Sequence, residues 1–98
     1  MRFLLFIFAD DKTASYEESL FYQMPDKQLL IFLAIAQEGK AGEVTGGKFI
    51  KKHKLNSASS ISAALKGLLE KDFITMDRNM YYVYDQFFAL WLKFKGLI

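Results

Sequence analysis

The chain has 98 residues, of which 52% are hydrophobic and 16% aromatic, so it can build one small domain with a single core. It contains no cysteine, which excludes a disulfide framework and a thiolate metal site. Residues 1–47 hold four basic against seven acidic residues, a net of −3, and residues 48–98 hold nine against four, a net of +5. The basic half is typical of a nucleic-acid-binding surface or, equally, of a solvated lysine-rich face.

The first 23 residues are predicted to be an extension of a main domain that spans residues 24–98. An apolar run at residues 3–8 is too short to cross a bilayer, which takes about 20 apolar residues, and a poor signal-peptide cleavage site follows it. We therefore expect a cytoplasmic protein with no membrane partner. After a loop, a short helix is expected to begin at a Ser15 cap. The run is expected to pack on a partner, most simply a second copy of the chain, through Phe3, Leu4, Phe6, Ile7 and Phe8.

A helix is predicted over residues 24–39, and it should be the central buried helix because its apolar residues occupy more than one side. Pro25 suits its first turn and Gly39 its end. A loop follows, with a short strand expected at residues 43–45. Thr45 is expected to cap the next helix.

Two short helices with a tight bend between them are predicted between residues 48 and 70. Asn56 and Ser57 form the polar corner, and Ser57 or Ser59 can cap the second helix. From Ile61 onward, apolar residues recur at i, i+3, i+4, i+7 and i+8, which predicts one buried stripe. The opposite face is small or basic, as in a helix that enters a major groove. It carries Ser59, Ser60, Ser62, Ala63, Lys66 and Gly67.

The remaining residues are predicted to form a hairpin and a last helix. The strands at residues 73–76 and 80–84 are joined by a turn in which Arg78 is the basic side chain at the tip. Asp85 should cap a final helix that is apolar nearly all round. Most of its side chains are expected in the core and the rest at an interface, to which we assign Phe87, Trp91 and Phe94.

Residues 61–74, ISAALKGLLEKDFI, resemble the recognition helix and first wing strand of the winged helix-turn-helix superfamily, although Asp72 stands where Gly is usual. The resemblance implies a mainly α fold with a small β-hairpin. We expect a three-helix core plus a short wing, with extra helical segments at the two ends.

Residues 24–93 are similar in order to the C-terminal winged-helix domain of archaeal-type AAA+ ATPases, a branch of the STAND nucleotidases. The most specific piece is VYDQFFALWL at residues 83–92, in which Gln86 and Ala89 replace the family's usual Pro and Arg. This resemblance implies that the chain is the tail of a larger ATPase, or a gene product that has lost the enzyme. The extension at residues 1–23 would then be a remnant of the preceding lid subdomain or a dimerisation arm.

We predict a protein without catalytic site, cofactor or metal. The phosphate-binding loop consensus is absent from the sequence, so the family's ATPase chemistry is not transferred to any residue. His53 lies among lysines, where like charge disfavours proton transfer, and is expected on the surface. The serines at 57–62 have no evident His or Asp partner to activate them, and the adjacent acidic pairs, such as Glu17 and Glu18, point in different directions.

Two functions stay open. In the first, the domain binds duplex DNA weakly, in a salt-sensitive manner. Its recognition face has no Arg, Asn or Gln for bidentate base readout, so little specificity is expected. The expected contacts are Lys51, Lys52, Lys54, Ser57, Ser59, Ser60, Ser62, Lys66 and Arg78. In the alternative, the domain binds no nucleic acid and is a docking module, and its aromatic ends mediate a dimer or contact a missing ATPase domain.

Overall fold

The computed structural model describes the backbone of residues 11–98 and the side chains from residue 17 onward. The expected interface residues Phe3, Leu4, Phe6, Ile7 and Phe8 lie outside the described residues. In chain order the elements are α2 (Asp11–Gln23), α3 (Asp26–Glu38), α4 (Gly47–His53), α5 (Ala58–Glu70), β1 (Ile74–Asp77), β2 (Met80–Val83) and α6 (Gln86–Phe94). This is the mainly helical fold with one small hairpin that the sequence predicts.

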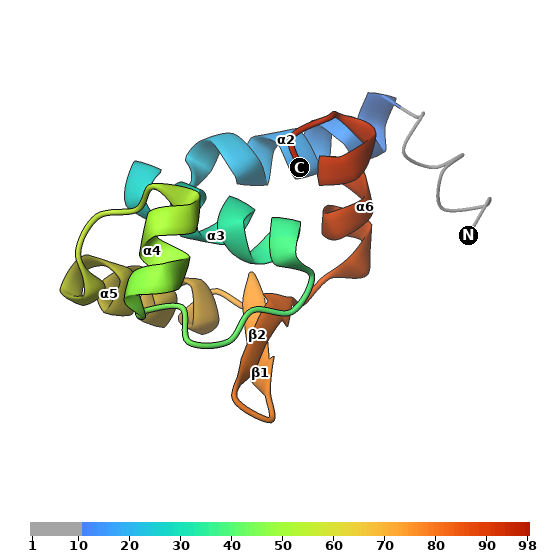
Figure 1. The fold of residues 1–98 in the computed structure, drawn as a ribbon. Coiled ribbons are helices and arrows are strands. Elements are labelled where there is room, and N and C mark those ends of the chain that lie inside the picture. Colours follow the sequence, from blue (N-terminus) through green and yellow to red (C-terminus); the bar gives the residue numbers. More distant parts are fainter. Residues whose placement is uncertain (1–10) are drawn as a thin grey trace.

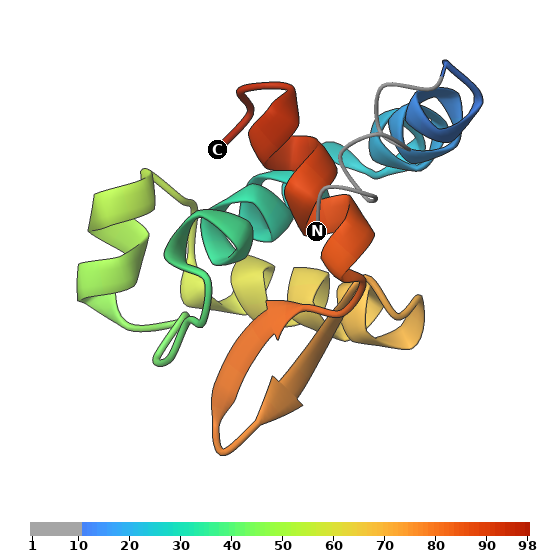
Figure 2. The ribbon, with the colours of Figure 1, turned by 90° about the vertical axis from the view of Figure 1, so that its right-hand side faces the viewer.

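Helix α3 is the central helix of the molecule, as expected. It lies between α2 on one side and α5 on the other (Figures 1 and 2). Phe32 and Ile35 are fully buried, and Phe32 makes edge contacts with the rings of Phe73 and Phe88. The predicted helix end is confirmed, because Gly39 adopts a φ of 82° there, a conformation that costs glycine little.

Helix α2 begins earlier than the sequence predicts. Its backbone is helical from Asp11, so Ser15 lies inside the helix and the expected cap at this position is wrong. A Ser followed three residues later by Glu is only a local signal, and it does not stop a helix that is already formed before it. Helix α2 packs on α6, where the ring centroids of Phe21 and Trp91 lie 5.7 Å apart.

The loop before α4 also differs from the prediction. The strand expected at residues 43–45 is absent, and an isolated bridge pairs Ala41 with Tyr81 instead. The chain turns at Glu43, whose φ is 48°, and the Gly46 N–H donates to the Glu43 carbonyl at 2.9 Å. Gly46 precedes α4 without a side-chain cap, so the expected Thr45 cap is wrong.

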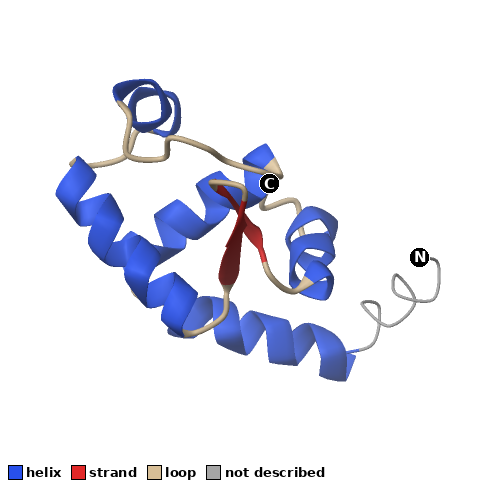
Figure 3. Ribbon diagram, turned by 90° about the horizontal axis from the view of Figure 1, so that it is seen from below, coloured by secondary structure: helices blue, strands red, loops and turns tan. Residues whose placement is uncertain are grey.

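The hairpin is antiparallel, with Ile74 opposite Val83 and Asp77 opposite Met80. Arg78 and Asn79 form its two-residue turn, and both adopt positive φ values, 53° and 65°, as a hairpin turn of this length requires. The strands protrude from the end of the molecule opposite α2 (Figures 1 and 2), and seen from below they lie with helices on either side (Figure 3).

Helix α6 follows the hairpin, and its predicted cap is confirmed. The Asp85 carboxylate accepts a hydrogen bond from the Phe87 N–H at 2.9 Å. Phe88, Trp91 and Leu92 are buried against the rest of the core. The assignment of Trp91 to an interface is therefore wrong, because its indole is only 2% exposed and contacts the rings of Phe21 and Phe88.

Candidate nucleic-acid interface

The bend between α4 and α5 is built by two local conformations. Lys54 ends α4 with a left-handed φ of 54°, and Ser57 starts α5 in an extended conformation. The Ser57 hydroxyl accepts a hydrogen bond from the Ser60 N–H at 3.3 Å and lies 3.1 Å from the Ser59 hydroxyl. Of the two serines proposed as the cap, Ser57 is the one used, and a helix-turn-helix results.

Helix α5 has one buried and one exposed face, as its periodicity predicts. Ile61, Ala64, Leu65 and Leu68 are buried, and α5 packs mainly on α3. The exposed side chains of α5 are small except for one cation, Lys66, and one acid at the end of the helix, Glu70. The small ones are Ala58, Ser59, Ser62 and Ala63.

Two residues assigned to this face lie at its margin. Ser60 is half-buried in a hollow that Lys27 and Gln28 of α3 also line. Gly67 is also half-buried, and a side chain added there would meet the Gln28 amide. Ser60 is therefore less accessible than Ser59 or Ser62, and Gly67 lies beside the Gln28 side chain of α3.

Along the sequence of the helix-turn-helix, no acidic residue interrupts the lysines before Glu70, the last residue of α5. Residues 44–69 contain five lysines and neither Asp nor Glu. All five are exposed, and one of them, Lys48, was not among the predicted contacts. They are Lys48, Lys51, Lys52, Lys54 and Lys66.

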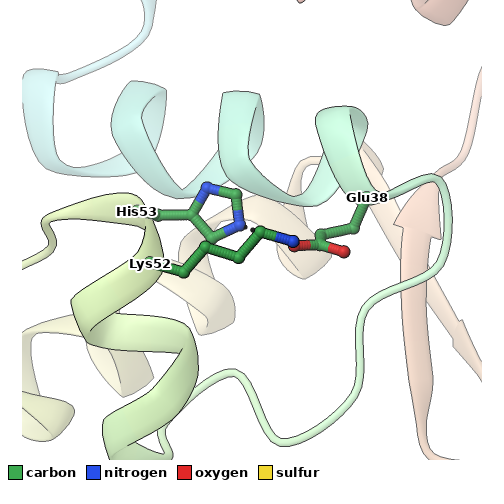
Figure 4. A network of polar contacts seen from close by, with 3 residues as sticks. All are labelled: Glu38, Lys52 and His53. Atoms are coloured by element: carbon green, nitrogen blue, oxygen red, sulfur yellow. Dashed lines mark hydrogen bonds and ion pairs between the residues drawn. The ribbon is translucent and has the colours of Figure 1, made fainter.

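One acidic residue reaches these lysines from α3. Glu38 Oε2 lies 2.7 Å from Lys52 Nζ and 2.8 Å from His53 Nε2 (Figure 4). Both contacts lower the pKa of the Glu38 carboxyl, first that of Lys52 and then that of His53. The carboxylate is thus ionised at neutral pH and can only accept, so His53 Nε2 carries the proton of this bond.

The surface position expected for His53 is wrong. Its side chain is 8% exposed, and its ring lies 4.6 Å from that of Phe49. The lysines beside it in the sequence do not decide its surroundings, because Glu38, fifteen residues away, is its hydrogen-bond partner. Sequence spacing gave no signal for this contact.

A cavity of about 380 Å³ lies where α3 ends and α4 begins. Its charged lining residues are two acids, Glu38 and Glu43, and three lysines, Lys40, Lys48 and Lys52. Lys40 Nζ also lies 5.5 Å from the centre of the Tyr82 ring at the base of the hairpin. The cavity therefore lies beside α4, and one of its lysines also contacts a ring of the hairpin.

The tip of the hairpin carries the exposed side chain of Arg78. Asp77 and Asn79 beside it are also exposed, so the local charge is balanced rather than strongly positive. The hairpin and α5 lie at the same end of the molecule, away from α2 (Figures 1 and 2). This arrangement brings the one predicted basic residue of the hairpin to the same end as the exposed face of α5.

The contact between α2 and α6 holds a second set of unusual groups. Glu17 is 3% exposed, and its Oε2 has no hydrogen-bond partner among the described residues; the same holds for Trp91 Nε1. Burial, and to a smaller extent the Asp85 carboxylate, raises the pKa of Glu17 to about 7. This burial was not predicted, although Glu17, Phe21 and Met24 follow helical spacing.

The apolar side chains expected at an interface differ in exposure. Phe94 is 54% exposed and Phe87 is half-buried. The structure adds exposed apolar side chains that the sequence analysis did not single out. The most exposed are Tyr22 at 73% and Tyr84 at 61%.

Neither a metal centre nor a membrane span is evident in the part of the chain that the structure describes. Within it, His, Cys, Asp and Glu side chains do not gather in groups of three or more that could hold an ion. None of its helices has the length and apolar character needed to cross a bilayer.

A family model described as "Probable winged helix domain" matches residues 14–94. Searches of curated proteins and of solved structures each found no significant match. The matched region covers most of the chain and includes the helix-turn-helix, the hairpin and α6. The chain therefore belongs to the winged-helix family that this model describes.

Proposed function

We propose that this domain is a non-catalytic module that binds duplex DNA weakly and with little sequence preference. Helix α5 would enter the major groove, and lysines of the helix-turn-helix would contact phosphates on either side. The observation that carries this proposal is the exposed face of α5, where Ser59, Ser62, Ala63 and Lys66 leave room for close approach to the groove. An equally exposed face rich in acids or bulky apolar residues would oppose it.

The chemistry of that face supports low specificity. Hydroxyls can hydrogen-bond to several base edges, whereas bidentate pairing with guanine or adenine needs Arg, Lys, Asn or Gln. Lys66 is the one such residue on the exposed face. Affinity would then come mainly from phosphate contacts, for which Lys48, Lys51 and Lys54 are exposed.

The hairpin would add one contact. Arg78 lies at its tip, at the same end of the molecule as α5 (Figure 1), so a duplex lying along α5 would bring a phosphate or the minor groove within its reach. With about five phosphate contacts in all, affinity should fall roughly 500-fold between about 50 and about 200 mM salt.

The absence of catalysis is part of the proposal. The Ser57 hydroxyl serves as the cap of α5, and His53 is hydrogen-bonded to Glu38. These contacts give both groups structural roles and support a binding module over a hydrolase. We also propose a cytoplasmic location, because the apolar run at residues 3–8 is too short to cross a bilayer and a poor signal-peptide cleavage site follows it.

Fluorescence polarisation with a short mixed-sequence duplex tests the proposal. Lys51→Glu and Lys66→Glu should each weaken binding by about tenfold or more at about 50 mM salt. Lys95→Glu makes the same charge change at an exposed position after α6 and should weaken binding by at most about threefold. Equal losses for all three variants, or no binding by the wild type, would overturn the proposal.

A docking role is the second candidate, and the exposed aromatic side chains Tyr22, Tyr84 and Phe94 favour it. The partner would be a second copy of the chain or an AAA+ ATPase domain, as the resemblance to the C-terminal domains of those enzymes implies. Sedimentation equilibrium tests the first partner and would detect a concentration-dependent dimer. An ATPase gene next to this reading frame, whose product binds the purified domain, would support the second.

A further inference from the structure

Both ion pairs found among the described side chains end on a single atom. Lys52 Nζ and His53 Nε2 lie 2.7 and 2.8 Å from Glu38 Oε2, and Figure 4 shows both side chains reaching from α4 to the end of α3. Lys52 is 64% exposed and Glu38 is 24% exposed, so the contact is open to solvent on the lysine side. The other four lysines of residues 44–69 have no ion pair within the described part of the chain.

The position of the Glu38 oxygen is chemically that of a bound anion. An ammonium group and an imidazole N–H both donate to it, and a phosphate oxygen would accept the same two bonds. The ion pair also forms part of the wall of the cavity of about 380 Å³ that Lys40 and Lys48 line. A phosphate that enters this cavity would meet Lys40 and Lys48, the acidic side chain of Glu43, and a Lys52 already neutralised by Glu38.

We propose that Glu38 is an internal competitor for the phosphate groups of DNA, which withholds Lys52 from the duplex and keeps the affinity of the helix-turn-helix low. This inference rests on the proposed DNA-binding function. Glu38 acts through Lys52 and does not itself contact the duplex, so it is a tuning residue of the binding site. Removal of the Glu38 charge should add a phosphate contact between Lys52 and the duplex. If Glu38 were only a structural link between α3 and α4, its removal would add no such contact.

The central experiment compares two substitutions that make the same charge change. Glu38→Gln keeps a side-chain oxygen that can accept from His53 and removes the charge that holds Lys52. Glu43→Gln is the matched control, because Glu43 is exposed, lines the same cavity and has no ion pair among the described residues. Thermal unfolding of both variants establishes that each is folded.

Glu38→Gln should raise the magnitude of the slope of log affinity against log salt by about 0.9, the value for one added phosphate contact. The gain in affinity should therefore be about threefold larger at about 50 mM than at about 200 mM salt. Glu43→Gln should leave the slope unchanged. Identical slopes and affinities for the two variants would overturn the inference while leaving DNA binding intact.

A double-mutant cycle locates the effect on Lys52. In a Lys52→Gln background, Glu38→Gln has no lysine to release, so the increase in slope should disappear. If the increase persists in that background, Glu38 acts through general charge and the inference is wrong.

A measurement without DNA separates this inference from the proposed function. Inorganic phosphate, added to the folded protein, should shift the side-chain NMR signal of Lys52 more strongly in Glu38→Gln than in the wild type. Equal responses would overturn the inference. If the wild type and every variant fail to bind duplex while the phosphate response differs, DNA binding is wrong and the competition by Glu38 holds.

Discussion

The polar groups at the two ends of this small domain differ in burial and in hydrogen bonding. Around α4 and α5, the lysines are exposed and the hydroxyl of Ser57 is satisfied by its role as a cap. Between α2 and α6, Glu17 Oε2 and Trp91 Nε1 are buried without a partner among the described residues. Surface charge contributes little to stability, whereas a buried polar group without a partner costs free energy. Substitutions at the α2–α6 contact should thus change stability, and substitutions around α4 and α5 should change binding.

The largest effect expected from this contrast is the loss of Trp91. Trp91→Ala removes a 2%-exposed side chain that contacts Phe21 and Phe88, and should lower the free energy of unfolding by about 3–5 kcal/mol. Urea unfolding measures this change in the free energy of unfolding. Trp91→Phe keeps an aromatic ring and removes the unpartnered N–H, so it should cost much less. A loss as large for Phe as for Ala would mean that the indole N–H has a partner.

The second effect depends on pH and belongs to Glu17. Its pKa is raised from 4.5 to about 7 in the folded protein, first by burial and then by Asp85. The folded state therefore holds its proton more tightly than the unfolded state. The stability associated with protonated Glu17 is complete below about pH 4.5 and is lost as the pH rises to about 7, a change of up to roughly 3 kcal/mol.

Glu17→Gln should remove this pH dependence and make the protein more stable than the wild type at about pH 8. Urea unfolding at a series of pH values measures the difference between the two proteins. Glu18→Gln is the control, because Glu18 is its exposed neighbour on α2, and this variant should follow the wild-type profile. Parallel profiles for the wild type and Glu17→Gln would contradict the burial of Glu17.

Features that are set by residues close together in the chain could be predicted from the sequence. The apolar stripe of α5, the Ser57 and Asp85 caps and the turn at Arg78 and Asn79 are each set by residues within a few positions of one another, and all are present in the structure. Their physical causes are local periodicity, capping and turn geometry.

The wrong caps at Ser15 and Thr45 are local errors, but the other features that were not predicted depend on contacts between distant residues. His53 was assigned to the surface because its neighbours in the chain are lysines, but Phe49 and Glu38 cover it. The bridge between Ala41 and Tyr81 pairs segments forty residues apart. Trp91 lies in the core because α2 covers α6, and the periodicity of α6 alone does not reveal this contact.

The smallest expected effect concerns Arg78, whose substitution should change both stability and binding. Arg78 adopts a left-handed φ of 53° at the hairpin tip, a conformation that Asn tolerates better than Arg. Arg78→Asn should therefore raise the free energy of unfolding by up to about 1 kcal/mol. It should also weaken duplex binding several-fold and reduce the magnitude of the salt slope by about 0.9, because one phosphate contact is lost.

A control for Arg78→Asn is the neighbouring change Asn79→Gly. Glycine suits the positive φ of 65° at this position, so the hairpin should keep its stability while Arg78 remains in place. Duplex affinity and salt slope should then match the wild type. If Asn79→Gly weakens binding as much as Arg78→Asn, the conformation of the hairpin tip governs binding. If neither change affects the salt slope, the hairpin makes no phosphate contact, and binding rests on the helix-turn-helix alone.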